Sequence, residues 1–267
     1  LQIASLSGLV VGSFDPAGPP VADYLGPDIV GRIRRVLPKP LKVLGYYTQT
    51  MRNNWKLYFE NVKDPYHASI LHLFFTTFRL NRLSQKGGII VDDSGGHHVS
   101  YSKLDEKPGG DGDYNSAELR ADTDEFGLKA PALLGGRDEF DDGITLQILT
   151  VFPGLVLQQV RNSLVVRQIV PRGVDRTDVV WTNYGFADDD EELADLRLLQ
   201  ANFIGPAGYI SMEDGAVVAM IQRALPGTKG DTSVVKMGGD GTASQESRAT
   251  ETSIRGFWKA YRKIMDI

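Results

Sequence analysis

The middle of the chain holds four short segments, rich in β-branched and apolar residues, that follow one another with brief connections. They run from 144 to 151, 155 to 160, 163 to 170 and 178 to 186. Such segments predict consecutive strands of an antiparallel meander. The segment 250–265 places its apolar residues, Met265 included, on one helical stripe, and such a helix needs a sheet to cover. We therefore expect an α+β fold in which a curved antiparallel sheet wraps around a long C-terminal helix and leaves an apolar cavity.

The remaining segments supply further helices and strands. Hydrophobic spacing and Pro or Gly stops predict helices at 27–37, from 54 up to Pro65, at 193–202 and at 212–224, a strand at 46–51 and a hairpin at 88–104. The span 108–142, rich in Gly, Asp and Glu, predicts an irregular excursion or lid. The acidic run 188–192 indicates a solvated helix start rather than a site.

Composition narrows the class of protein. The 267 residues carry a net charge of −5, which argues against a nucleic-acid partner because phosphate binding needs a basic face. No apolar run approaches the roughly 18 residues of a membrane span, so we expect a soluble protein. The chain has no cysteine, which excludes disulfides, thiolate zinc sites and iron–sulfur ligation within these residues and suits the cytoplasm.

Two of the four histidines stand close together, in the pattern Asp64-x-x-His67-x4-His72. At this spacing two side chains on a regular helix differ by roughly 140° of rotation, so they do not share a face. They converge on one ion only if the helix is broken or ends between them, and Pro65 supplies an irregularity just upstream. From the spacing alone, it is the commoner interpretation that both histidines make structural contacts and do not bind a metal.

A second acidic region, 211–215, changes that balance. Ser211 and Asp214 have the spacing of a capping box at the start of a helix, which is one interpretation. The other is that Asp214 joins His67 and His72, because two histidines and one carboxylate occupy one face of a non-heme iron and leave positions open. Nitrogen and oxygen ligands without a thiolate suit Fe(II) better than structural zinc.

The segment NWKLYFENVKDPYHASILH, residues 54–72, resembles the mononuclear-iron motif of the large (alpha) subunits of Rieske non-heme iron aromatic-ring-hydroxylating dioxygenases. The similarity continues through FFTTFRLNRLSQKGG, SGGHHVSYS, LQILTVFPGLVLQQ, GPAGYISMEDGA and RATETSIRGFWKAYRK, and is greatest to members that act on terephthalate. The resemblance implies a helix-grip fold, of the START/Bet v 1-like kind, in agreement with the pattern of strands and C-terminal helix.

The resemblance also implies roles for individual residues. It makes His67, His72 and Asp214 the ligands of a mononuclear Fe(II). It gives Asp64 a bridging role, hydrogen-bonded to an iron-ligating histidine and to a histidine of the Rieske cluster in a neighbouring subunit. Arg167, which interrupts an apolar strand, and Arg248, near the start of the C-terminal helix, would each bind a carboxylate of the substrate.

The family's [2Fe–2S] Rieske cluster needs two cysteines and two histidines, and this chain has no cysteine. We therefore expect residues 1–20 to be the trailing end of an absent Rieske domain and residues 21–267 to be the catalytic domain. Electrons would come from NADH through a separate reductase, and the working unit would be a homotrimer or an α3β3 assembly with a small subunit. Both atoms of dioxygen would add to terephthalate and give a cis-dihydrodiol.

Other interpretations stay open at this point. The same chemistry could act on another aromatic acid, such as isophthalate, or on salicylate as a monohydroxylation. A helix-grip domain could also bind hydrophobic molecules and carry only a vestigial metal site. His97 and His98 occupy adjacent, opposite-facing strand positions, so we interpret them as structural or pocket-lining residues.

Overall fold

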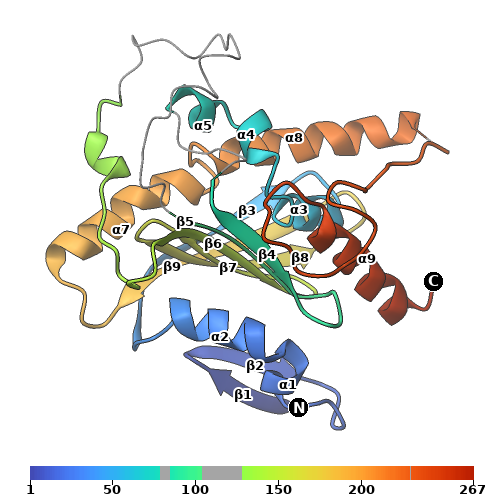
Figure 1. Cartoon of the computed structure of the whole chain (residues 1–267), viewed down its shortest axis with the longest axis horizontal. Helices are drawn as coiled ribbons and strands as arrows, with labels where there is room; N and C mark the ends of the chain where they lie inside the picture. The colour runs from blue at the N-terminus through green and yellow to red at the C-terminus, as the bar shows by residue number, and fades with distance from the viewer. Residues whose placement is uncertain (79–84, 104–127, 229) are drawn as a thin grey trace.

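The computed structural model describes residues 1–78, 85–103, 128–228 and 230–267, and its centre is one antiparallel sheet of seven strands (Figure 1). The strands lie in the order β3-β9-β8-β7-β6-β5-β4, each antiparallel to its neighbours. Their bounds are Leu41–Met51 (β3), Gly87–Val91 (β4), His98–Lys103 (β5), Ile144–Val151 (β6), Leu155–Val160 (β7), Ser163–Pro171 (β8) and Thr177–Phe186 (β9). The predicted meander and the predicted hairpin are both confirmed.

The sheet is covered on both faces, which explains why its strands are apolar on both sides. Along β7, Val156 and Leu157 are adjacent and fully buried, yet they belong to two different hydrophobic clusters. Leu164 and Val165 on β8 divide in the same way. Since neighbouring residues of a strand point to opposite faces, each cluster lies on one face of the sheet.

One face is covered by the N-terminal elements (Figure 1). Helix α2, Pro27–Val36, turns Ile29, Ile33 and Val36 towards the sheet and ends one residue before the predicted Leu37. Beyond it lie α1, Val21–Leu25, and a separate two-stranded sheet of β1, Gln2–Leu6, and β2, Leu9–Ser13.

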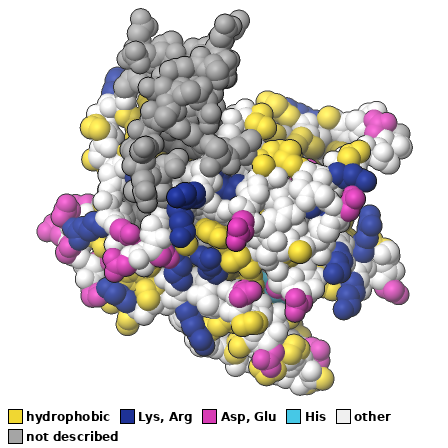
Figure 2. All heavy atoms as spheres, in the orientation of Figure 1, with side chains coloured by type: hydrophobic (Ala, Val, Ile, Leu, Met, Phe, Trp, Pro, Cys, Tyr) yellow, Lys and Arg dark blue, Asp and Glu magenta, His cyan; other side chains and the backbone are white. Residues whose placement is uncertain are grey.

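The opposite face carries the remaining helices, and Phe59 and Trp181 are buried in the core between them and the sheet. These helices are α3 (Trp55–Asn61), α4 (Ala68–Leu71), α5 (Leu73–Thr77), α7 (Glu191–Ile204), α8 (Ser211–Ala224) and α9 (Thr252–Met265), with short 3-10 turns at Pro131–Leu134 and Leu225–Gly227. In the orientation of Figure 2, hydrophobic side chains gather over α8 at the upper right, where Met220 and Ile221 are exposed.

Helix α9 packs against β4 and, through the first part of its predicted stripe, against α3. Phe257 is fully buried and packs against Trp55, Phe59 and Tyr261. The last turn departs from the prediction, because Met265 and its neighbour Ile264 are more than half exposed. The mixed fold of helices and antiparallel sheet expected from the sequence is therefore present, with a helix that leaves the core before it ends.

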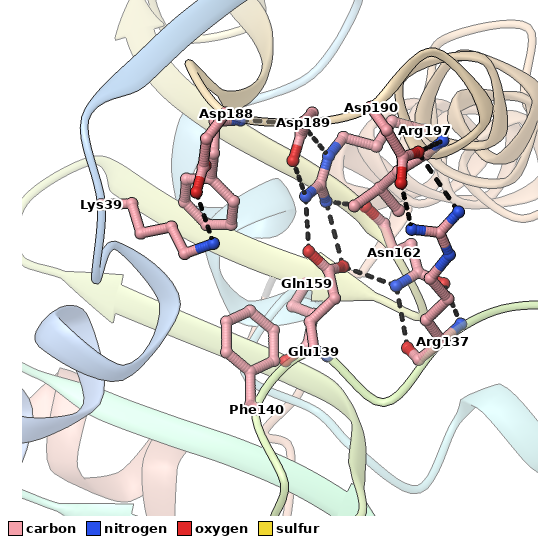
Figure 3. A network of polar contacts seen from close by, with 12 residues as sticks. Lys39, Arg137, Glu139, Phe140, Gln159, Asn162, Asp188, Asp189, Asp190 and Arg197 are labelled. Atoms are coloured by element: carbon pink, nitrogen blue, oxygen red, sulfur yellow. Dashed lines mark hydrogen bonds and ion pairs between the residues drawn. The ribbon is translucent and has the colours of Figure 1, made fainter.

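A polar network joins the start of α7 to the segment that precedes β6 (Figure 3). The guanidinium of Arg197, which is 1% exposed, forms ion pairs with Glu139 at 2.5 Å and with Asp189 at 2.7 Å. Asp190 caps α7 by accepting a hydrogen bond from the backbone N–H of Leu193. The acidic run thus starts a helix as predicted, but Asp189 is buried rather than solvated.

The predicted excursion lies largely outside the described residues, which omit 104–127. In the part of the chain that the structure covers, no helix has both the length and the apolar character needed to cross a lipid bilayer.

Candidate metal centre

The histidine pair lies where the helical chain breaks, as its spacing requires. Oδ1 of Asp64 accepts hydrogen bonds from the backbone N–H groups of Tyr66 and His67 at 3.1 and 3.2 Å and so turns the chain into α4. Helix α4 has only four residues and ends at His72, whose backbone is extended (φ −79°, ψ 102°). The two imidazole centroids are consequently 5.1 Å apart. The helical chain is therefore interrupted at His72 and not at Pro65, the residue that the sequence suggested.

Asp214, in the first turn of α8, completes the cluster. Its Oδ1 lies 3.4 Å from Nε2 of His67 and 3.3 Å from Nε2 of His72. One ligand atom from each of the three residues lies within 4.8 Å of the others, and this is the only such group among the described residues. Helix α8 begins at Ser211 with no side-chain cap, so the capping-box interpretation of 211–214 is wrong.

The charges of the three groups are strongly coupled. Burial by itself would lower the pKa of His67, but the nearby carboxylates of Asp214 and Asp64 raise it to about 10. Burial would likewise raise the pKa of Asp214, and the two imidazoles instead hold it well below its ordinary range. Oδ1 of Asp214 is buried without a well-formed hydrogen bond, because both imidazole contacts are long. A cation between these atoms would satisfy that oxygen.

A further carboxylate contacts the pair from outside. Oε2 of Glu213 lies 2.8 Å from Nδ1 of His72, and its Oε1 accepts a hydrogen bond from the backbone N–H of Leu73 at 3.2 Å. On the other imidazole, Oδ1 of Asp64 lies 3.7 Å from Nδ1 of His67. Sequence reasoning missed Glu213, although its position next to Asp214 was a usable signal.

A pocket opens beside the three residues. The wall is mostly apolar, and Arg167, Arg248 and Gln158 line it together with the metal-ligand candidates. The sequence singled out the two arginines, and the structure places both of them in this pocket.

Arg167 is a buried cation, 3% exposed, held by neutral groups. Its Nη1 donates a hydrogen bond to the Tyr58 hydroxyl at 2.8 Å, its Nη2 donates to the side-chain oxygen of Gln158, and its guanidinium carbon lies 5.0 Å from the ring centroid of Trp181. Among the described residues, no carboxylate lies within ion-pair distance of it. Tyr58 and Gln158 were not predicted, since neutral residues carry no sequence signal for this role.

Arg248 is also buried, and its Nη2 donates a hydrogen bond to the backbone carbonyl of Pro65 at 3.4 Å. Burial lowers its pKa to about 10. The contact with Pro65 places this arginine beside the turn that leads into His67.

His97 and His98 lie away from the cluster and diverge, in agreement with their opposite-facing positions. The backbone N–H of Phe152 donates to Nδ1 of His97, while Nδ1 of His98 lies 3.2 Å from Nζ of Lys63. Lys63 is fully buried and donates to Thr150 Oγ1 at 2.7 Å, a role that the sequence did not reveal.

Residues 38–267 match the family model described as ring hydroxylating alpha subunit (catalytic domain). The chain is 58% identical, over 99% of its length, to the terminal oxygenase component subunit alpha 2 of terephthalate 1,2-dioxygenase from a Comamonas species. It is 40% identical, also over 99% of its length, to the large subunit of anthranilate 1,2-dioxygenase from Burkholderia cepacia. It spans only 64% and 63% of these two relatives.

Solved structures show the same fold. The crystal structure of naphthalene 1,2-dioxygenase from a Rhodococcus species, bound to indole, matches 99% of this chain and 66% of that chain, with a TM-score of 0.78. The sequence identity is 20%, so this likeness concerns the fold alone.

Proposed function

Since the chain belongs to the family of ring hydroxylating alpha subunits, as a catalytic domain, we propose that it is the iron-binding part of an oxygenase that acts on an aromatic dicarboxylate. The preferred substrate is terephthalate, to which both atoms of dioxygen are added to give a cis-dihydrodiol. The observation that carries the proposal is that three suitable metal ligands and Arg167, a buried cation, line one pocket. The relative at 58% identity, named for terephthalate, supports this choice of substrate.

The residues that would hold the metal are His67, His72 and Asp214. Two imidazole nitrogens and one carboxylate oxygen on one side of an ion match the ligand set of non-heme Fe(II) oxygenases. The orphaned Oδ1 of Asp214 between the two Nε2 atoms supports the fit. Bound there, Fe(II) would supply open coordination positions at which dioxygen is activated next to the ring.

Arg167 would bind and orient the substrate. A guanidinium buried among neutral partners has donors and charge to offer a carboxylate, and each such charge-assisted contact contributes about 1.5–3 kcal/mol. Tyr58 and Gln158 fix the guanidinium on one side, which favours a single ring position. Arg248 would bind the second carboxylate of a diacid, and the apolar wall would exclude water from the ring.

The chain spans 64% and 63% of the length of these two relatives. The supply of electrons is therefore a proposal about the full-length protein. The proposal includes a [2Fe–2S] Rieske cluster in the full-length protein, with residues 1–20 adjoining its domain, and a separate reductase that takes electrons from NADH. Asp64 would bridge the iron site to the cluster of a neighbouring subunit, in a homotrimer or an α3β3 assembly. We also propose a helix-grip arrangement, which the packing of α9 against β4 supports.

The test uses the full-length protein with its reductase, NADH and dioxygen. Terephthalate, isophthalate, benzoate, anthranilate and salicylate are offered singly, and products are identified by mass spectrometry and NMR. We expect a cis-dihydrodiol from terephthalate, with a preference over benzoate of at least about tenfold, because benzoate leaves one arginine without a carboxylate. Faster turnover of another aromatic acid would overturn the substrate assignment, and no turnover of any acid with iron bound would favour a binding module.

A further inference from the structure

Glu213 contacts the candidate metal centre without being one of its ligands. It sits in the first turn of α8, directly before Asp214, and its side chain is 26% exposed. We propose that Glu213 is a positioning residue, which holds His72 in its metal-binding tautomer and secures the chain break that brings the two histidines together. The inference rests on the iron site proposed above and adds a residue to it.

The position of the hydrogen on His72 decides which ring nitrogen can bind an ion. A neutral imidazole carries one N–H, and the other nitrogen offers a lone pair. A carboxylate accepts hydrogen bonds only, so Oε2 of Glu213, 2.8 Å from Nδ1, places the hydrogen on Nδ1. Nε2, which lies 3.3 Å from Asp214, is then left with its lone pair towards the ion. A carboxylate behind a ligating histidine has this effect in many metal sites.

Glu213 also contacts the backbone next to His72. His72 is the extended residue between α4 and α5, and this break is what allows histidines five positions apart to converge. The other oxygen of Glu213 accepts a hydrogen bond from the backbone N–H of Leu73, the first residue of α5. One carboxylate therefore holds both the ring of His72 and the residue that follows it.

The two histidines differ in how closely a carboxylate contacts Nδ1 of the ring. Asp64 stands behind His67 as Glu213 stands behind His72, but the Asp64 contact with Nδ1 is 3.7 Å and is longer than a hydrogen bond. His72 is also the more buried ring, with 2% of its side chain exposed against 19% for His67. Of the two histidines, only His72 has its ring held by a short carboxylate contact, from Glu213. Glu213 lies in α8, the helix that also carries Asp214.

The proposal predicts that metal retention depends on Glu213. We would bind Co(II) to the metal-free mononuclear site of the full-length protein, measure its affinity by competition with a chelator, and record the EPR spectrum of the bound ion. Glu213→Ala removes both contacts, and its affinity should fall by about 10–100-fold with an altered spectrum. Glu213→Gln has a single carbonyl oxygen for two donors, so its affinity should lie in between and its spectrum closer to that of the wild type.

The matched control is Glu191→Gln, the same chemical change at an exposed position in the first turn of α7, which should bind Co(II) as the wild type does. Wild-type affinity and spectrum in both Glu213 variants would overturn the proposal. If Glu213→Ala does not fold, as judged by circular dichroism, Glu213→Gln decides alone because it keeps the shape of the side chain. Asp214→Ala tests the proposed iron site separately from the role of Glu213. If this variant binds Co(II) like the wild type, the proposed iron site itself is wrong.

Discussion

Nε2 of His67 lies 3.4 Å from Oδ1 of Asp214, although His67 precedes α4 and Asp214 lies in α8, far apart in the sequence. This pairing, together with Asp64, raises the pKa of His67 to about 10 in the metal-free protein. A histidine must be neutral to bind a metal, so the proton competes with the ion at every pH below that value.

Metal affinity should therefore rise with pH. Between pH 7 and 9 the metal-free His67 holds a proton that metal binding must release, and the affinity for Co(II) should increase by up to about tenfold per pH unit. Titration calorimetry in two buffers of different ionisation enthalpy at pH 8 should show close to one proton released per ion. A flat affinity over this range, with no proton release, would contradict the coupling of His67 to Asp214.

Replacement of Arg167 should weaken substrate binding. Arg167→Met keeps an apolar side chain in the strand but removes the buried cation, and the KM for terephthalate in the full-length enzyme should rise about 10–100-fold. The control is Arg172→Met, one residue past the end of β8, where an exposed arginine pairs with Asp178. An unchanged preference for terephthalate over benzoate in Arg167→Met would refute the role of this residue.

Lys63 should make stability depend on pH. Burial lowers its pKa to about 7 from an ordinary value of 10.5. Between these values the unfolded chain binds one proton more than the folded chain, so the free energy of unfolding should rise with pH by up to about 1.4 kcal/mol per unit. Lys63→Met should remove this dependence, and the control Lys42→Met, at an exposed position on β3, should keep it. Urea unfolding at pH 7, 8 and 9 measures the slopes, and parallel slopes for wild type and Lys63→Met would contradict the prediction.

The network in Figure 3 should stabilise the fold through Arg197. Arg197→Met leaves the carboxylates of Glu139 and Asp189 buried without their cation, and it should lower the free energy of unfolding by about 3–5 kcal/mol. Lys39→Met removes an exposed pair with Asp188 and should leave stability unchanged. Equal urea midpoints for the two variants would show that burial of the Arg197 pairs has no such effect.

Much of the fold follows from local patterns in the sequence. Strands β6 to β9 and the hairpin of β4 and β5 were predicted almost to the residue, because short apolar segments separated by turn residues are read directly. The exposure of Met265 at the end of α9 was not predicted. Hydrophobic periodicity does not reveal where such a helix leaves the core.

The candidate metal centre was predictable only in part. The spacing of His67 and His72 correctly required a break in the helix, but its position at His72 depends on local backbone geometry. The residue types offered Asp214 as a third ligand only as one of two interpretations, which the resemblance then favoured, because the contact itself depends on the packing of α8. Tyr58, Gln158 and Lys63 act through contacts between distant segments, which composition and residue spacing do not reveal.

The most direct test of the central claim is the iron content of the mononuclear site. The full-length protein is reconstituted anaerobically with Fe(II), freed of loosely bound metal, and analysed together with Asp214→Ala, with the iron of the Rieske cluster counted separately. We predict about one mononuclear iron per wild-type chain and none in the variant, because Asp214→Ala would remove one of the three proposed ligands. The absence of mononuclear iron in the wild type, or an equal amount in Asp214→Ala, would contradict the account.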